Sequence, residues 1–311
     1  MSLLIGAFTM GIILSLLSLG MLLSFKMIKF TDITVDGSLT LGASICSLLI
    51  LNGFNPWIAT LSAFIVGAGA GFVTGFMHTK FKVQQILSGI LVMTALYSIN
   101  LRIMGRSNIS LINLPTVFDS IKHLLKFKDK TFILGWEISI NEITVILSSF
   151  IIILIIGFAL YTFLKTNFGT ALRATGNNQQ MVKAQGINHN YMIVFTLALS
   201  NALVAASGGL LAQYQGFADI QMGIGMMVWG LASIIIGEAL IAKHSIGLLI
   251  SGTIFGTIIF RLLIAMALRW GLNPNDLKLV TALFVFIALT SPMYFKYLSK
   301  KLFKGAANDK D

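Results

Sequence analysis

Charged side chains are scarce in this chain: they make up 11% of its 311 residues, whereas hydrophobic side chains make up 56%. Soluble domains usually carry about twice that share of charge. A mean hydropathy of +0.89 points the same way and excludes an ordinary soluble domain. The bilayer is therefore the natural solvent for most of this protein.

Motifs for catalysis are also missing. No GxxxxGK[ST] phosphate loop occurs, so the chain cannot bind ATP through the usual P-loop arrangement. The histidines are scattered, and none lies four residues from another histidine or from a cysteine, as a helical metal site would require. The single cysteine, Cys46, cannot form an intrachain disulfide. We expect no enzymatic activity, no catalytic residue, no metal site and no cofactor of its own.

Long apolar runs, in contrast, recur along the whole chain. Crossing the hydrocarbon takes about 17 to 25 mostly apolar residues per helix. A shorter run, 39–51, is expected to be a half-helix or broken helix. The full-length runs are 3–24, 57–77, 86–103, 143–164, 191–211, 225–242, 246–268 and 279–298. We expect an all-α polytopic membrane protein of about nine segments, with one transmembrane domain over residues 1–298 and a basic tail at 299–311.

Charge predicts how these segments are oriented, because Lys and Arg near helix ends are retained in the cytoplasm. Placing the loop 165–190 in the cytoplasm puts the N-terminus outside and the basic C-terminal tail inside. The loop 102–141 is then extracytoplasmic, although it carries several cations and fits the rule least well. The net charge of +11 forms no dense basic stripe, so we expect no nucleic-acid partner.

Glycine spacing predicts how the helices meet. Lipid provides no hydrophobic force between helices, and small residues let two backbones approach closely. Gly67, Gly71 and Gly75 lie on one helix face, and Gly252 and Gly256 share another. We expect both faces to pack against neighbouring helices rather than to bind a nucleotide.

A short internal echo links the two halves of the chain. FTDI at 30–33 matches FADI at 217–220, and Ala-Ser-Ile follows each copy, at 43–45 and 232–234. The two preceding helices run in opposite directions in the predicted topology, which is typical of an inverted repeat around a central path. Chance similarity of two tetrapeptides is the alternative.

Acidic residues beside a broken helix usually serve a cap, a cavity or a pathway. Asp36 or Ser38 could cap the half-helix, or the residues around it could line a translocation path, and both roles are compatible. The candidate path residues are Asp32, Asp36, Gly37, Ser38, Phe217 and Asp219.

Three further polar side chains lie inside apolar runs. Arg261 is expected to extend its side chain to the outer interface. Asn100 and Asn201 are expected to form interhelical hydrogen bonds rather than to bind substrate.

A polar island, 168–187, interrupts the apolar pattern most clearly. We expect short helices at 170–175 and 179–185, ended by Gly176 and Gly186, since glycine suits the position after a helix. Apolar side chains of the island are expected to pack against each other and a partner. A self-contained loop is the alternative.

The island carries a resemblance to a known family. ALRATGxNxxxxxAxGI at 171–187, VDGSLTLGA at 35–43 and the run 198–240 are similar to the membrane permease of ABC importers in the branched-chain amino acid and ribose group. The similarity covers most of the chain and is strongest to a bacterial subgroup linked to tryptophan or tyrosine uptake.

The resemblance implies a multi-pass protein of the bacterial inner membrane that works as a homodimer. Two P-loop ATPase subunits would bind ATP on the cytoplasmic side, and an extracytoplasmic binding protein would deliver the substrate, with 106–141 as a candidate dock. Residues 172–178 would form a coupling helix. The implied ATPase-coupling residues are Leu172, Arg173, Ala174, Thr175, Gly176, Asn177, Asn178, Ala184, Gly186 and Ile187.

The sequence thus favours the permease subunit of an ATP-driven amino acid importer, with an aromatic substrate such as tryptophan, while branched-chain amino acids, sugars and nucleosides stay open. The alternative is an ion-coupled secondary transporter of a small polar solute, which also uses inverted repeats and broken helices. Such a carrier normally needs intramembrane acids or histidines, and here these are few.

Overall fold

The computed structural model describes residues 2–125, 131–133, 136–138, 140–241, 245–271, 276, 279–287 and 290. Helices make up most of these residues, and strand β1 pairs with β4 while β2 pairs with β3, both antiparallel. The strands are β1 (Asn108–Ser110), β2 (Thr131–Ile133), β3 (Trp136–Ile138) and β4 (Phe217–Asp219). The helices are α1 (Ser2–Met21), the π-helix η1 (Leu22–Met27), α2 (Thr34–Leu51), α3 (Pro56–Phe81), α4 (Gln85–Met104), α5 (Val117–Leu125), α6 (Ile140–Lys165), α7 (Asn167–Asn177), α8 (Gln179–Ala184), α9 (His189–Gln215), α10 (Met226–Ala239) and α11 (Ile246–Arg269).

Seven segments of the described chain are long and apolar enough to cross a membrane. They confirm the expected all-α polytopic membrane architecture. Of the last predicted run, 279–298, the described residues are 279–287, which are helical, and 290. The seven segments are Leu3–Met27, Thr34–Leu51, Pro56–Phe81, Gln85–Met104, Glu142–Lys165, His189–Gln215 and Ile246–Arg269.

The discontinuous helices differ from the prediction. The run expected to be a short half-helix at 39–51 begins earlier, at Thr34, and reaches 18 residues in α2. The run expected to span at 225–242 forms instead a helix of only 14 residues, α10. Helix α10 begins at Met226, directly after Gly225 (φ 87°), and ends at Ala239, before the end of the predicted run. Hydropathy alone cannot show this, because Leu240 and Ile241, which follow the helix, are as apolar as the helix itself.

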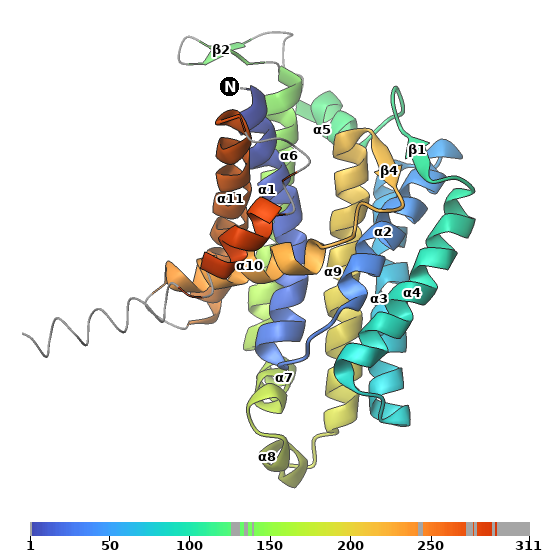
Figure 1. Ribbon diagram of the computed structural model, residues 1–311, viewed down its shortest axis with the longest axis vertical. Coiled ribbons are helices and arrows are strands. Elements are labelled where there is room, and N and C mark those ends of the chain that lie inside the picture. The colour runs from blue at the N-terminus through green and yellow to red at the C-terminus, as the bar shows by residue number, and fades with distance from the viewer. Residues whose placement is uncertain are drawn as a thin grey trace, which may run out of the picture.

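The helices form an elongated bundle (Figure 1). The N-terminus, α5, β1 and β4 lie at one end of it, and α7 and α8 lie at the other. Helices α1 and α9 run antiparallel, as the repeat hypothesis requires, and α10 lies across the bundle near mid-height. Most of the α9 surface is buried, because α1, α2 and α3 all pack around it.

The predicted glycine faces are helix contacts. Gly67, Gly71 and Gly75 of α3 face the backbone of α9, where a β-carbon at position 75 would lie 2.8 Å from the α-carbon of Val194. Gly252 and Gly256 of α11 face α10. The predicted role of these glycines in helix packing is therefore confirmed.

Two glycines of α3 provide a matched test of this packing. A side chain at Gly71 would overlap the Leu197 carbonyl, whereas a β-carbon at Gly69 would have nothing within 4 Å. We expect Gly71→Val to destabilise the purified protein by about 1 to 3 kcal/mol or more, the usual effect of overpacking. Gly69→Val should melt close to the wild-type temperature. Equal melting temperatures for the two variants would contradict the α3–α9 contact.

Candidate functional site

Two helices that begin inside the bundle meet at Asp36. This residue lies in the first turn of α2, and its carboxylate accepts hydrogen bonds from the backbone N–H groups of Gly225 (2.8 Å) and Met227 (2.7 Å). Those groups belong to the start of α10, where the helix dipole is positive and a carboxylate is stabilising. Asp36 therefore joins α2 to α10 across the middle of the fold.

Asp32, just before α2, forms the centre of a second polar network. Its buried carboxylate accepts from the Thr34 N–H at 2.9 Å and from the Asn201 side-chain amide at 2.6 Å. The Ser38 hydroxyl donates to the Asn201 carbonyl oxygen at 2.7 Å. One amide of α9 thus connects Asp32 and Ser38.

The other buried asparagine, Asn100 of α4, donates its amide to the Gly37 carbonyl at 3.2 Å. Each of the two asparagines links α2 or the residues before it to another helix, so the predicted interhelical role of Asn100 and Asn201 is confirmed. Gly37 itself lies against α4, since a β-carbon there would lie 3.0 Å from Leu96.

The capping hypothesis is wrong for α2 itself. Because α2 begins at Thr34, Asp36 and Ser38 lie inside it, and no side chain of the N-cap residue Ile33 caps it. Asp36 caps α10 instead. The sequence gives no local sign of that pairing, since the partners are 189 residues apart along the chain.

Phe217 and Asp219 lie away from this junction. They form the ends of β4, where Phe217 is paired with Ser110 and Asp219 with Asn108 of β1, at the N-terminal end of the bundle (Figure 1). The structure therefore brings the predicted path residues Asp32, Asp36, Gly37 and Ser38 together, and places Phe217 and Asp219 elsewhere.

The two copies of the internal echo nevertheless share a local geometry. Asp32 accepts from the N–H of Thr34, and Asp219 accepts from the N–H of Gln221 at 2.7 Å. In both turns the Asp side chain accepts a hydrogen bond from the backbone N–H two residues later. Each turn precedes a helix that begins inside the bundle, which supports the inverted-repeat interpretation.

Arg261 contacts the two neighbouring helices α1 and α10, and its expected extension to the outer interface stays a prediction. Its guanidinium donates to the Met10 sulfur at 2.6 Å and lies 5.0 Å from the centre of the Trp229 ring. Helices α1 and α10 both pack against α11, and the Trp229 ring of α10 provides a cation–π contact for the charge.

The polar island forms two short helices, α7 and α8, at the end of the bundle opposite the N-terminus (Figure 1). Thr166 accepts from the N–H of Gly169 and caps α7, while Asn178 accepts from the N–H of Met181 and caps α8. Leu172 and Val182 are fully buried within the chain itself, Leu172 in the main core of the bundle, whereas Met181 of the same island is exposed. The expected packing of the island against a partner stays a prediction.

Gly176 has a different role from the predicted one. It lies within α7 rather than after it, and a side chain there would overlap the Met27 carbonyl of η1. Close contact between α7 and η1, not a helix end, requires this glycine. Gly186, at φ 75°, does follow α8 as expected.

The other predicted coupling residues divide between the bundle and the surface. The guanidinium of Arg173 turns back to the Thr170 hydroxyl at 3.2 Å. Leu172 and Thr175 are buried, Arg173, Ala174, Gly176 and Ile187 are half-buried, and Asn177, Asn178, Ala184 and Gly186 are exposed.

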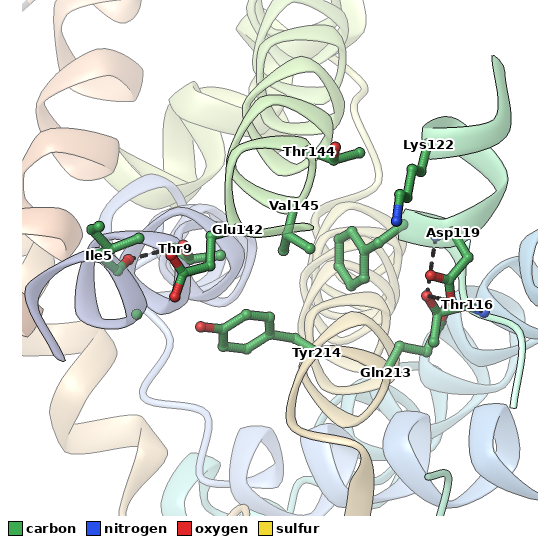
Figure 2. A pocket seen from close by; sticks show the side chains of 12 residues that line it. Ile5, Thr9, Thr116, Asp119, Lys122, Glu142, Thr144, Val145, Gln213 and Tyr214 are labelled. Carbon is green, nitrogen blue, oxygen red and sulfur yellow. Dashed lines mark hydrogen bonds between the residues drawn. The ribbon is translucent and has the colours of Figure 1, made fainter. Parts of the chain in front are cut away.

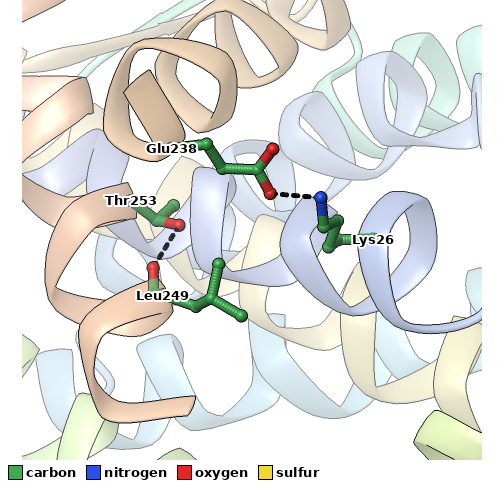
Figure 3. A network of polar contacts seen from close by, with 4 residues as sticks. All are labelled: Lys26, Glu238, Leu249 and Thr253. Atoms are coloured by element: carbon green, nitrogen blue, oxygen red, sulfur yellow. Dashed lines mark hydrogen bonds and ion pairs between the residues drawn. The ribbon is translucent and has the colours of Figure 1, made fainter. Parts of the chain in front are cut away.

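An ion pair joins η1 to α10. Lys26 and Glu238 are 2.6 Å apart and partly exposed (Figure 3). The sequence suggests Lys243 and His244 as neighbours of Glu238, but those two residues lie outside the described ones. Helix α10 is therefore held at its end by η1 and at its start by Asp36.

Within the described chain, no group of three or more acidic, histidine or cysteine side chains could hold a metal ion.

Comparisons with known proteins agree with this architecture. The family described as "Branched-chain amino acid transport system / permease component" matches residues 3–290. The tyrosine transport system permease protein of Clostridioides difficile is 42% identical, over 94% of this chain and 92% of the relative. A probable branched-chain amino acid transport permease of Methanocaldococcus jannaschii is 28% identical, over 81% of this chain and 77% of the relative.

A more distant relative is an autoinducer 2 import system permease of Yersinia enterocolitica, 27% identical over 81% of this chain and 63% of the relative. No solved structure matches the chain significantly. Since the family match covers nearly the whole chain, this multi-pass membrane protein belongs to the family of branched-chain amino acid transport system permease components.

Proposed function

We propose that this chain is the membrane permease subunit of an ATP-driven ABC importer. It would work as a homodimer with two ATPase subunits in the cytoplasm and a substrate-binding protein outside. The observation that carries the proposal is the pair of short polar helices, α7 and α8, which lie at one end of an apolar bundle and contact it through Gly176. In this proposal, residues 172–178 are the coupling helix and 165–190 the coupling loop.

A continuous set of contacts leads from α7 to the centre of the fold. Gly176 brings α7 against η1, Lys26 of η1 pairs with Glu238 of α10, and Asp36 ties the other end of α10 to α2. Closure of the ATPases would move α7, and these contacts would pass the shift to a central path beside α2 in an alternating-access cycle. No bond is made or broken in this chain.

The proposed orientation follows from the position of the island. With α7 and α8 in the cytoplasm, the N-terminus, β1 and α5 are outside, because they lie at the opposite end of the bundle (Figure 1). The loop 102–141 is then extracytoplasmic and the tail 299–311 cytoplasmic. The membrane would be the inner membrane of a bacterium.

For the substrate we propose an amino acid, with an aromatic one favoured. The relative from Clostridioides difficile, named for tyrosine transport, shares 42% of its aligned residues with this chain. The more distant relatives, named for branched-chain amino acids and autoinducer 2, share 28% or fewer.

The alternative, an ion-coupled carrier, would need a carboxylate that binds the coupling ion. Asp36 is engaged by two backbone N–H groups of α10, and Asp32 by Thr34 and Asn201. Structural roles therefore account for both acids, which favours the importer.

Uptake by reconstituted vesicles separates the two functions. We expect uptake of radiolabelled L-tyrosine or L-tryptophan to need the ATPase subunits, the binding protein and ATP, and to survive an ionophore that collapses ion gradients. Uptake by the permease alone, or its loss on adding the ionophore with ATP intact, would favour the secondary carrier.

Labelling tests the proposed orientation independently. In a Cys46→Ser background, an impermeant thiol reagent applied to intact cells should label Asn113→Cys, an exposed position near β1. It should not label Gln180→Cys, an exposed position in α8, until the membrane is permeabilised. The reverse pattern would place the island outside and end the coupling proposal.

A further inference from the structure

An apolar groove of about 380 Å³ runs along the outside of the bundle between α6 and α11. On α6 it extends over residues 153–161, and on α11 over residues 247–254. Helix α1 packs against both of these helices. Leu154 and Phe158 of the wall are exposed, so the groove opens to the surrounding lipid.

The depth of the groove matches one leaflet of the membrane. It occupies the second half of the span Glu142–Lys165 and the first half of the span Ile246–Arg269. A β-carbon on Gly247 would lie 3.2 Å from the Tyr161 ring, so the end of α6 and the start of α11 lie at the same depth. Residues 153–161 advance by about 12 Å along a helix axis, and one leaflet supplies about half of a hydrocarbon core of about 30 Å.

Positive charge lies at the mouth of the groove. The ammonium of Lys165, the last residue of α6, lies over the Tyr161 ring, 4.5 Å from its centre. Gly247, in the first turn of α11, lies against the edge of the same ring, and the start of a helix carries partial positive charge. Tyrosine rings favour the level of the lipid headgroups. The ammonium and the helix start are therefore placed where a headgroup would lie.

The chain from α6 to α9 carries no acidic side chain that would oppose this charge. Residues 143–218 contain no Asp or Glu but contain three Lys or Arg residues. Glu238, at the end of α10, is paired with Lys26. The acids Asp119 and Glu142 lie beside a polar cavity at the opposite end of the bundle (Figure 2). The end of the bundle next to α7 therefore complements an anionic headgroup.

Gly157 keeps the groove open. It belongs to the wall of the groove, and a β-carbon there would lie 3.7 Å from Ile250 and Ile254, an ordinary contact distance. The contact between α6 and α11 therefore tolerates a side chain at this position, unlike the α3–α9 contact at Gly71. A larger side chain at position 157 would occupy the groove itself.

We propose that this groove binds one acyl chain of an anionic phospholipid, whose phosphate lies next to Lys165 and the start of α11. An acyl chain is the apolar ligand that the bilayer supplies at this depth, and basic pockets between transmembrane helices bind anionic headgroups. The inference goes beyond the proposed function and does not depend on it. In the proposed orientation, the lipid belongs to the cytoplasmic leaflet.

Native mass spectrometry of the purified full-length permease tests the headgroup preference. The probes are phosphatidylglycerol and phosphatidylcholine with the same two oleoyl chains, added in equal amounts, and the first bound lipid is measured. We expect the wild type to retain more phosphatidylglycerol. Lys165→Gln should reduce this preference about fivefold, the usual contribution of one basic residue near anionic lipid. Lys183→Gln, which removes an exposed cation of α8 outside the groove, should keep it.

Filling the groove tests the place of the acyl chain. Gly157→Leu should lower the retention of the first phosphatidylglycerol at least about tenfold, which corresponds to about two displaced methylene groups. Gly69→Leu adds the same side chain at an exposed helix position, where a β-carbon has nothing within 4 Å. This control variant should retain phosphatidylglycerol like the wild type.

Three results would each refute the site: equal retention of the two lipids by the wild type, an unchanged preference in Lys165→Gln, or normal retention by Gly157→Leu. The same spectra report dimers of the chain. If Gly157→Leu dissociates a dimer and leaves lipid retention unchanged, the groove holds a second copy instead of a lipid. Uptake by vesicles tests the importer separately, so the lipid site can fail while the proposed function stands.

Discussion

Replacing Gly176 with alanine should abolish ATP-dependent uptake while leaving the protein folded in the membrane. The added methyl group would overlap the Met27 carbonyl and lie 2.8 Å from the α-carbon of Ile28, and both partners are backbone that cannot rotate away. Helix α7 must then move off η1. We expect uptake to fall at least about tenfold, equivalent to about 1.4 kcal/mol in the rate-limiting barrier.

The comparison that gives this result meaning is Gly69→Ala, since a β-carbon at that helical position has open space around it. Uptake by Gly69→Ala and the amount of either variant in the membrane should match wild type. Binding of the ATPase to the Gly176→Ala permease, measured by co-purification, shows whether the defect lies in assembly or in the cycle. Normal uptake by Gly176→Ala would refute the role of the α7–η1 contact.

Removal of the Asp36 carboxylate should have the second large effect. Asp36→Ala leaves the N–H groups of Gly225 and Met227 without their acceptor inside the bundle. Each hydrogen bond to a charged group contributes about 1.5 to 3 kcal/mol. We therefore expect a marked fall in the melting temperature of the purified protein and loss of uptake.

Two further substitutions distinguish this junction from a general effect of losing an acid. Asp36→Asn keeps one acceptor oxygen and should lie between wild type and Asp36→Ala in stability. Asp219→Ala removes one solvent-exposed hydrogen bond, from the N–H of Gln221, instead of two part-buried ones, and should therefore lower the melting temperature less than Asp36→Ala does. If Asp36→Ala melts no lower than Asp219→Ala, Asp36 does not hold α10 to α2.

Local patterns in the sequence predict the parts of this fold that depend on local composition. Apolar length predicts the spans, such as 246–268 in α11, and spacing predicts the face of Gly67, Gly71 and Gly75. The island at 168–187 stands out because its polarity contrasts with both neighbours.

Features that depend on distant partners are not predictable in this way. Hydropathy cannot tell that 225–242 forms a short helix lying across the bundle, because its residues are as apolar as those of a span. The hydrogen bonds of Asp36 and the contact of Arg261 with the Trp229 ring each join segments far apart in the chain. Gly176 looks like a helix end until η1 is seen beside it.

The pairing of Asp36 with the start of α10 also has an electrical consequence. The partial positive charge of the helix start offsets part of the negative charge of the Asp36 carboxylate. An inorganic cation is therefore attracted to this junction less strongly than it would be to a carboxylate without such a partner.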